Sequence, residues 1–359
     1  MNDFQANVRA VLARIQDPHT GVDLVESGAL KGAVSTDGRG LVDLVLPYAS
    51  RSWHDTLRGQ VQAALVQAGM DSVQVSIDQR IVAHQVRDGL SPLPEVRNII
   101  AVASGKGGVG KSTTSVNLAL ALAAEGARVG VLDADIYGPS VPRMLGVSGR
   151  PDSRDGKRII PKESHGLQCM SIGFMIEEDT PMIWRGPMVT QALQQMLGET
   201  DWQDLDYLVI DLPPGTGDIQ LTLSQKVPVS GSVIVTTPQD ISLIDARKAL
   251  RMFEKVEVPV LGIVENMSTH ICGNCGHVEP IFGQGGGEQM AADYKVPLLG
   301  QLPLSMAIRE QADSGRPTVI AQPDSEAAAA YRHIARSAAG RLSRRPRSKA
   351  MGLPGIVIE

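Results

Sequence analysis

The chain has 359 residues, enough for two or three domains, and 43% of them are hydrophobic, as in ordinary soluble globular proteins. Its formal net charge of −5 excludes the general attraction of strongly basic proteins for nucleic acid and for anionic membranes. Met1–Gln16 lacks the pattern of a signal peptide, and no run reaches the roughly 18 apolar residues that span a bilayer. We therefore expect a cytoplasmic enzyme with no nucleic-acid partner and no stable membrane association.

Residues 1–78 are predicted to form a small α/β domain. Apolar residues recur at helical spacing from Phe4 to Ile15, and Asp17-Pro18 is expected to end this helix. Three later runs predict strands at residues 30–34, 41–46 and 72–77. A second helix is predicted before the last of these strands, at residues 53–67. Residues 79–97 contain Pro92 and Pro94 and are predicted to be a linker.

Residues 98–342 are predicted to form a second, larger domain of the α/β class. Short apolar runs recur, each followed by a turn and a helical segment, at residues 99–103, 129–132, 207–210, 233–236, 260–264 and 297–302. This alternation predicts a mostly parallel, doubly wound sheet, in which ligands bind beyond the carboxyl ends of the strands. The basic tail, residues 343–359, is expected to be a solvated end rather than a membrane or nucleic-acid contact.

A phosphate-binding loop follows the first of these strands and opens a helix. Gly105–Ser112 fits the pattern G-x-x-x-x-G-K-[ST]. Its glycines let successive N–H groups point at one anion, and the helix N-terminus adds positive charge. Lys111 is expected to neutralise the β- and γ-phosphates of ATP, and Ser112 to ligate Mg²⁺. The predicted nucleotide-binding residues here are Gly105, Lys106, Gly107, Gly108, Val109, Gly110, Lys111, Ser112 and Thr113.

Two further strands end in carboxylates at the same edge of the predicted sheet. Asp211 ends the run Leu208–Ile210 and is expected to hold Mg²⁺ through its water shell, and the glycine-rich segment after it is expected to sense the γ-phosphate. Asp133 and Asp135 end another strand. A lone aspartate at a strand end is often a helix cap, but two beside a phosphate loop favour a place in the nucleotide site.

Cys272 and Cys275 form a C-x-x-C turn flanked by glycines. Two thiolates at this spacing can bind one metal ion or one side of a cluster, whereas a closed site needs four ligands. The simplest completion is a homodimer that contributes four cysteines. Zinc, an iron–sulfur cluster and a redox pair all remain open, although the turn lacks the strand-to-helix context of a redox pair. Cys169 is expected in the core, and the neighbours His270 and His277 are expected to be satisfied or solvated.

Lys106 is a second lysine that the basic phosphate-loop pattern does not require. With it, Gly105–Ser112 resembles the deviant Walker A family that includes MinD, ParA and the nitrogenase iron protein. This resemblance implies that Lys106 reaches the partner's nucleotide across a dimer interface and that Asp135 orients or deprotonates the attacking water. Lys106, Lys111 and Asp135 are thus the expected catalytic residues, while Asp133 is expected to support the Mg²⁺ shell. The alternative for Lys106 is a solvated loop lysine.

Taken together, the chain resembles the Mrp/ApbC group of iron–sulfur cluster carrier ATPases. The matching segments are 105–112, 133–140, 184–187, 211–218, 266–267 and the cysteine pair. The resemblance implies a [4Fe–4S] cluster bound between two subunits by Cys272 and Cys275 and delivered to apo iron–sulfur proteins. It also implies that Asn266 and Pro303 contact the base. Residues 1–78, through Asp17–Gly21, resemble the small iron–sulfur-assembly domain of bacterial members.

Two other functions fit part of the same pattern. A positioning ATPase of the MinD or ParA type would share the phosphate loop and Lys106 but would not need the cysteine pair. A regulatory ATPase with a structural zinc would use the cysteines and transfer nothing. Vesicle or DNA binding would distinguish the first, and metal analysis of protein purified without oxygen would distinguish the second.

Overall fold

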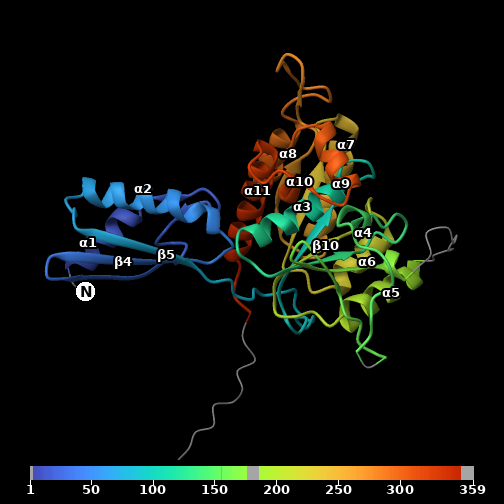
Figure 1. The fold of residues 1–359 in the computed structure, drawn as a ribbon, viewed down its shortest axis with the longest axis horizontal. Helices are drawn as coiled ribbons and strands as arrows, with labels where there is room; N and C mark the ends of the chain where they lie inside the picture. The colour runs from blue at the N-terminus through green and yellow to red at the C-terminus, as the bar shows by residue number, and fades with distance from the viewer. Residues whose placement is uncertain (1–2, 155, 176–185, 349–359) are drawn as a thin grey trace, which may run out of the picture.

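The computed structural model describes residues 3–154, 156–175 and 186–348 (Figure 1). In Figure 1 the small N-terminal domain lies beside a larger α/β domain that contains the rest of the described chain. Trp184 and Arg185, which belong to the family resemblance, lie outside the described residues.

In the small domain two helices cover one three-stranded sheet. The strand order is β3-β4-β5, with β3 antiparallel and β5 parallel to the central strand. Buried leucines and valines of α1, α2 and β4 form its core. The elements are α1 (Asp3–Leu12), β1 (Gln16–Asp17), β2 (Val22–Asp23), β3 (Leu30–Thr36), β4 (Arg39–Leu46), η1 (Arg51–Trp53), α2 (His54–Gln67) and β5 (Val73–Gln79).

The first helix ends earlier than its apolar spacing predicts. It stops at Leu12, because Arg14 and Ile15 donate to carbonyls three residues back and the Ile15 carbonyl accepts from Leu24. The prediction that Asp17-Pro18 ends this helix is therefore wrong, since Asp17 belongs to the short strand β1. The apolar spacing continues past the helix because Ile15 packs against the core from a turn.

An eight-stranded sheet forms the centre of the large domain, in the order β15-β12-β11-β6-β10-β7-β9-β8. All neighbouring strands are parallel except the edge pair β8 and β9. The predicted mostly parallel, doubly wound sheet is thus confirmed. The strands are β6 (Val96–Ala103), β7 (Val129–Asp133), β8 (Lys162–Ser164), β9 (Leu167–Ser171), β10 (Leu205–Asp211), β11 (Gly231–Thr236), β12 (Val260–Glu265) and β15 (Leu298–Gln301).

Helices cover both faces of this sheet, which explains why its central strands are continuous apolar runs. A side chain at Gly300, on the face of β15 toward α11, would meet Ile334, whereas Glu265 on the opposite face of β12 accepts from the Gly287 N–H of α8. The helices are α3 (Lys111–Ala124), α4 (Val141–Met144), α5 (Gly186–Glu199), α6 (Asp218–Lys226), α7 (Asp240–Lys255), α8 (Gly286–Tyr294), α9 (Met306–Asp313), α10 (Thr318–Ala321) and α11 (Glu326–Ser343), with η2 at Ile172–Phe174.

The described part of the basic tail is anchored to the linker. Gln85 donates its N–H to the Pro346 carbonyl at 2.8 Å, and Ser348 donates to the Ala83 carbonyl at 3.0 Å. The prediction of a solvated end is wrong for this backbone, although the side chains of Arg345 and Arg347 are exposed. The pairing escapes prediction because it joins segments some 260 residues apart in sequence, neither of which carries a strand pattern.

Candidate nucleotide site and cysteine hairpin

The phosphate loop connects β6 to α3 at the carboxyl edge of the sheet. Gly108 and Gly110 have φ angles of +79° and +81°, which L side chains rarely adopt. The Asn266 side-chain amide donates to the Val109 carbonyl at 2.9 Å and thereby fixes the loop from the residue that follows β12. A Cβ atom at Gly110 would lie 2.1 Å from that amide nitrogen, so only glycine fits there.

A cavity of about 210 Å³ opens over the loop. Its lining includes Ser140 and Met144 at α4, which the sequence analysis did not select as site residues. Both come within ten residues of Asp135 in the chain, and this proximity in sequence is the signal that could have found them. The lining residues are Ser104, Lys106, Gly107, Gly108, Gly110, Lys111, Ser112, Thr113, Asp135, Ser140, Met144 and Pro214.

Asp211 contacts the charged and hydroxyl groups below this cavity. It is fully buried and its carboxylate lies 2.8 Å from the Lys111 ammonium. The hydroxyls of Ser112 and Ser115 each donate to it at 2.6 Å. Ser115 is a further residue of the site that motif reasoning misses, because it lies one helical turn beyond the motif. Hydroxyl and carboxylate oxygens in this arrangement are the ligand types that Mg²⁺ prefers, so the residues present fit that ion.

Asp133 lies beside Asp211 and forms no ion pair of its own with any residue that the structure describes. It is buried, and it accepts from the N–H groups of Asp135 and Val141 and from the Ser171 hydroxyl, each at 3.1 Å. Burial, together with the neighbouring charge of Asp211, raises the pKa of Asp133 to about 7. The carboxyl group is therefore poised to hold or release a proton near neutral pH.

Asp135 lies closer to the cavity than Asp133. Its carboxylate is 3.7 Å from the Lys111 ammonium, and it lines the cavity directly. Burial raises the pKa of Asp135 above its usual value, and the charge of Lys111 opposes this shift. A carboxylate in this position can accept a proton from a water molecule that lies over the phosphate loop.

The two expected base-contacting residues lie on adjacent segments. Leu302, which precedes Pro303, donates to the Glu265 carbonyl at 2.9 Å, and Ser268 donates to the Leu302 carbonyl at 2.9 Å. Asn266 therefore lies next to the segment of Pro303, and its amide is already bonded to the phosphate loop. A base contact by either residue stays a prediction.

The cysteine pair occupies the turn of a two-stranded hairpin formed by β13 (His270–Ile271) and β14 (Val278–Glu279). In Figure 1 this orange hairpin region projects beyond α7 and α8. Both thiols are free, and Cys275 is exposed. The N–H groups of Asn274 and Cys275 and the Cys275 side chain lower the pKa of Cys272, which favours the thiolate that binds metal.

Within the described residues, no third histidine, cysteine or acidic side chain joins this pair to complete a metal site. The His270 ring contacts the Leu304 carbonyl, and His277 is exposed beside Glu279. The pair also does not precede a helix as in a redox motif, because it turns between two antiparallel strands. Cys169 is buried in β9, as expected.

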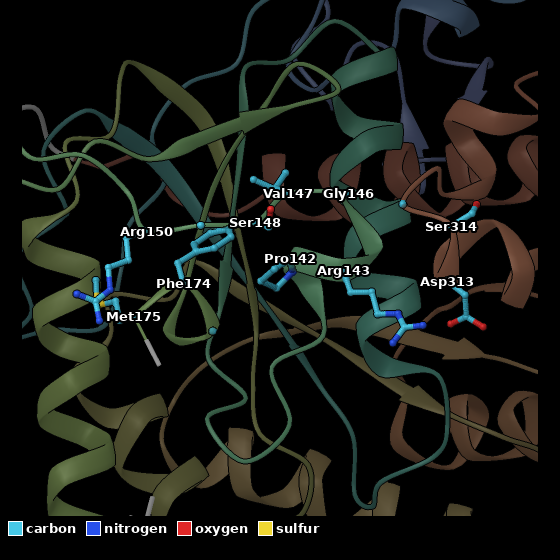
Figure 2. A pocket seen from close by; sticks show the side chains of 13 residues that line it. Pro142, Arg143, Gly146, Val147, Ser148, Arg150, Phe174, Met175, Asp313 and Ser314 are labelled. Carbon is cyan, nitrogen blue, oxygen red and sulfur yellow. The ribbon is translucent and has the colours of Figure 1, made fainter. Parts of the chain in front are cut away.

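A second cavity, of about 600 Å³, lies beside α4 (Figure 2). Pro142 and Arg143 of α4 line it together with Phe174 and Met175. Figure 2 shows Arg150 beside Met175, and Asp313 at the opposite end. Because Ser140 and Met144 line the smaller cavity, α4 borders both cavities.

Comparison with known families finds a matching family model for each of the two domains. A ParA family model, described as the NUBPL iron-transfer P-loop NTPase, matches residues 95–339. The chain belongs to this family. A second model, described as an iron–sulfur cluster assembly protein, matches residues 5–77.

Relatives of this P-loop NTPase match along most of the chain. The iron–sulfur cluster carrier protein of Escherichia coli (strain K12) is 54% identical over 341 residues, which cover 94% of this chain and 92% of the relative. The mouse iron–sulfur cluster transfer protein NUBPL is 52% identical over 257 residues, or 71% of this chain and 81% of its own. The family predicted from the motifs is confirmed.

Solved structures support the same fold. A nucleotide-binding protein from Archaeoglobus fulgidus in complex with ADP has a TM-score of 0.57 and 37% identity, covering 65% of this chain and 90% of its own. The Pyrococcus furiosus cell division ATPase MinD has a TM-score of 0.50 and 24% identity, covering 67% and 97%, and shows the fold alone. No helix among the described residues is both long and apolar enough to cross a bilayer.

Proposed function

We propose that this P-loop NTPase is an ATP-dependent iron–sulfur cluster carrier, which holds a [4Fe–4S] cluster between two subunits and delivers it to apo-proteins. One observation carries the proposal: a pair of free thiols, half-buried Cys272 and exposed Cys275, lies in the turn of a hairpin that belongs to a domain with a complete phosphate loop. The names of the relatives support the same function for this chain. A reducing cytoplasm suits it, because both thiols must stay free to accept cargo.

The nucleotide site has the groups that ATP hydrolysis needs. Ser112 and Asp211 would hold Mg²⁺, which when bound would neutralise charge on the phosphates. Lys111 lies between Asp211 and Asp135 and reaches the space over the loop. It would bind the β- and γ-phosphates, while Asp135 would take a proton from the attacking water. These roles are assigned from geometry and family resemblance.

A homodimer would bring two cysteine pairs together and supply four thiolates. Six exposed apolar residues belong to the hairpin, to the start of α7 and to segments that follow the hairpin in the chain, and we propose that together they form an interface patch, the hairpin face. Its members are Ile241, Ile244, Ile271, Val278, Ile281 and Met306, which are between 49% and 71% exposed. Such a patch marks a protein–protein contact, and a second copy is the partner that completes the metal site.

Lys106 lies close to the hairpin face. The preceding glycine, Gly105, packs against the backbone of Asp245 in α7, the helix that carries Ile241 and Ile244. Lys106 makes no ion pair within the described residues. The proposed interface would therefore include Lys106 and the start of α7 together with the cysteine hairpin.

The coupling of nucleotide to cargo is tested by cluster transfer to an apo-ferredoxin in the absence of oxygen. We expect Lys111→Ala to bind a cluster as the parent protein does, since the hairpin is untouched, but to lose the acceleration of transfer by Mg-ATP. Lys31→Ala, at an exposed lysine of the small domain, should transfer normally. Equal ATP-dependent transfer by Lys111→Ala and the parent would disprove the coupling.

A further inference from the structure

Helix α3 connects the phosphate loop directly to the small domain. It begins at Lys111 and ends at Ala124, and its 14 residues span about 21 Å. The residue at its C-terminal cap, Glu125, is fully buried at the contact between the two domains. Neither the nucleotide chemistry nor the cysteine hairpin uses this buried carboxylate.

The carboxylate of Glu125 has partners from both domains. From the small domain, Ser52 donates its N–H at 2.8 Å and its hydroxyl at 2.5 Å. From α11 of the large domain, Arg336 donates at 2.6 Å. The Glu125 carbonyl also accepts from the Arg51 N–H at 3.2 Å and from the Gln79 side-chain amide at 2.9 Å. A buried carboxylate must be paired on both oxygen atoms to be stable. Loss of the hydrogen bonds from either domain would therefore leave the Glu125 carboxylate partly unpaired.

Arg336 extends this joint to a second segment of the small domain. Its Nε donates to Nε2 of His19 at 3.1 Å, and its terminal nitrogen donates to the Ser52 hydroxyl at 2.7 Å. Burial and the nearby charge of Arg336 lower the pKa of His19 to about 3. The imidazole is therefore neutral and can accept this bond while its Nδ1–H donates to Ser337 at 3.1 Å.

We infer that docking of the small domain and binding of nucleotide are coupled through α3, with Glu125 as a positioning residue. The docked domain fixes the C-terminal end of the helix, and the phosphates would fix its N-terminal end. Because a helix of four turns is a rigid element, restraint of one end reduces the freedom of the other. The inference rests on the proposed nucleotide binding and gives residues 1–78 a role in it.

The coupling predicts an effect of Ser52 on nucleotide affinity. In this structure the phosphate loop precedes one end of α3 and Ser52 is bonded to Glu125 at the other end, so loosening that contact should weaken nucleotide binding. We expect Ser52→Ala, and separately Glu125→Gln, to raise the dissociation constant of a fluorescent Mg-ADP analogue by about threefold or more. The matched control is Ser76→Ala, which removes a hydroxyl bonded to Asp43 in the same domain but away from the joint. Its affinity should equal that of the parent.

The reverse effect follows from thermodynamic linkage and needs no variant. Saturating Mg-ADP should slow hydrogen exchange of the Arg51 and Ser52 amides by a similar factor and leave the Ser76 region unchanged. Unchanged affinity in both joint variants, with unchanged exchange in a parent that binds Mg-ADP, would overturn the coupling alone. Failure of the parent to bind Mg-ADP would instead overturn the proposed function, and the coupling with it.

Discussion

Two neighbouring aspartates at the carboxyl edge of the sheet have opposite electrostatic environments. Asp211 lies against the Lys111 ammonium and two hydroxyl donors. Asp133 is equally buried but makes no ion pair within the described part of the chain, and its pKa is raised to about 7. Two adjacent buried carboxylates cannot both ionise at low cost, so the one without the cation holds the proton.

This environment predicts that Asp133 lowers stability as the pH rises. Between its unfolded pKa of 3.8 and its folded pKa of about 7, the folded protein keeps a proton that the unfolded chain has lost. The stabilisation of the folded protein by the protonated Asp133 carboxyl group is thus complete below about pH 4 and is lost as the pH rises through 7. In urea unfolding without nucleotide or Mg²⁺, the free energy of unfolding of Asp133→Asn should increase relative to that of the parent by about 1–3 kcal/mol as the pH rises from about 5 to 8. A pH-independent difference between Asp133→Asn and the parent would contradict this assignment.

Asp135 gives a kinetic prediction at the same scale. If it accepts the proton of the attacking water, Asp135→Asn should lower the ATP hydrolysis rate by about 10²–10⁴-fold. Nucleotide affinity should change little, because the phosphate loop is intact. Asp152→Asn, at an exposed position, should hydrolyse at the parent's rate. Phosphate release close to the parent's rate by Asp135→Asn would remove Asp135 from the proposed catalytic role.

The motifs predict much of the nucleotide site because each motif determines the local geometry of the backbone that carries its residues. A glycine-rich turn between a strand and a helix places Lys111 and Ser112, and strand ends place Asp133, Asp135 and Asp211. Ser115, Ser140 and Met144 are missed because ordinary residue types carry no chemical signature. Only the three-dimensional path of α3 and α4 brings them to the cavity and its carboxylates.

At the scale of elements, the cysteine hairpin is the feature that departs most from an ordinary P-loop sheet. Its two short strands pair His270 with Glu279 and Ile271 with Val278, and the turn between them presents the thiols. The Cys272 N–H donates to the His277 carbonyl and its carbonyl accepts from Gly276, which closes the turn. The hairpin therefore offers two thiolates from a defined backbone.

Exposure of these thiols predicts their reactivity. Iodoacetamide should label two cysteines in the native protein, Cys272 faster than Cys275 because hydrogen bonds lower the pKa of Cys272. Cys169 should react only after unfolding, because it is buried and burial raises its pKa. Mass spectrometry of the labelled peptides gives the order. Rapid labelling of Cys169 in the folded protein would contradict the described position of β9.

The central strands are predictable from sequence, whereas the short elements are not. Strands β6, β7, β10, β11 and β12 are buried on both faces, so each reads as a continuous apolar run. The edge strand β8 has three partly exposed residues, and β13 and β14 have two residues each. Such segments lack a periodic pattern, and long-range pairing decides their structure.

At the scale of the whole molecule, the hairpin face sets the expected assembly. Gly105 of the nucleotide loop packs against α7, the helix that carries the exposed residues Ile241 and Ile244 of this face. A charge placed there should oppose dimer formation. Ile244→Asp is expected to shift the Mg-ATP-bound protein toward monomer by at least about tenfold in dissociation constant in analytical ultracentrifugation.

Val66→Asp is the matched control for this substitution, since Val66 is a 45% exposed apolar residue of the small domain. Its assembly should equal that of the parent. A dimer equally strong in Ile244→Asp and in the parent would place the interface elsewhere on the molecule.

The most direct measurement is reconstitution with iron and sulfide without oxygen, followed by iron counting and a visible spectrum. We predict about four irons per dimer and the broad absorbance of thiolate-bound clusters, both lost in Cys272→Ala/Cys275→Ala and both kept in Cys169→Ala. No cluster in the parent, or a cluster unaffected by loss of Cys272 and Cys275, would contradict the central claim that this hairpin carries the cargo.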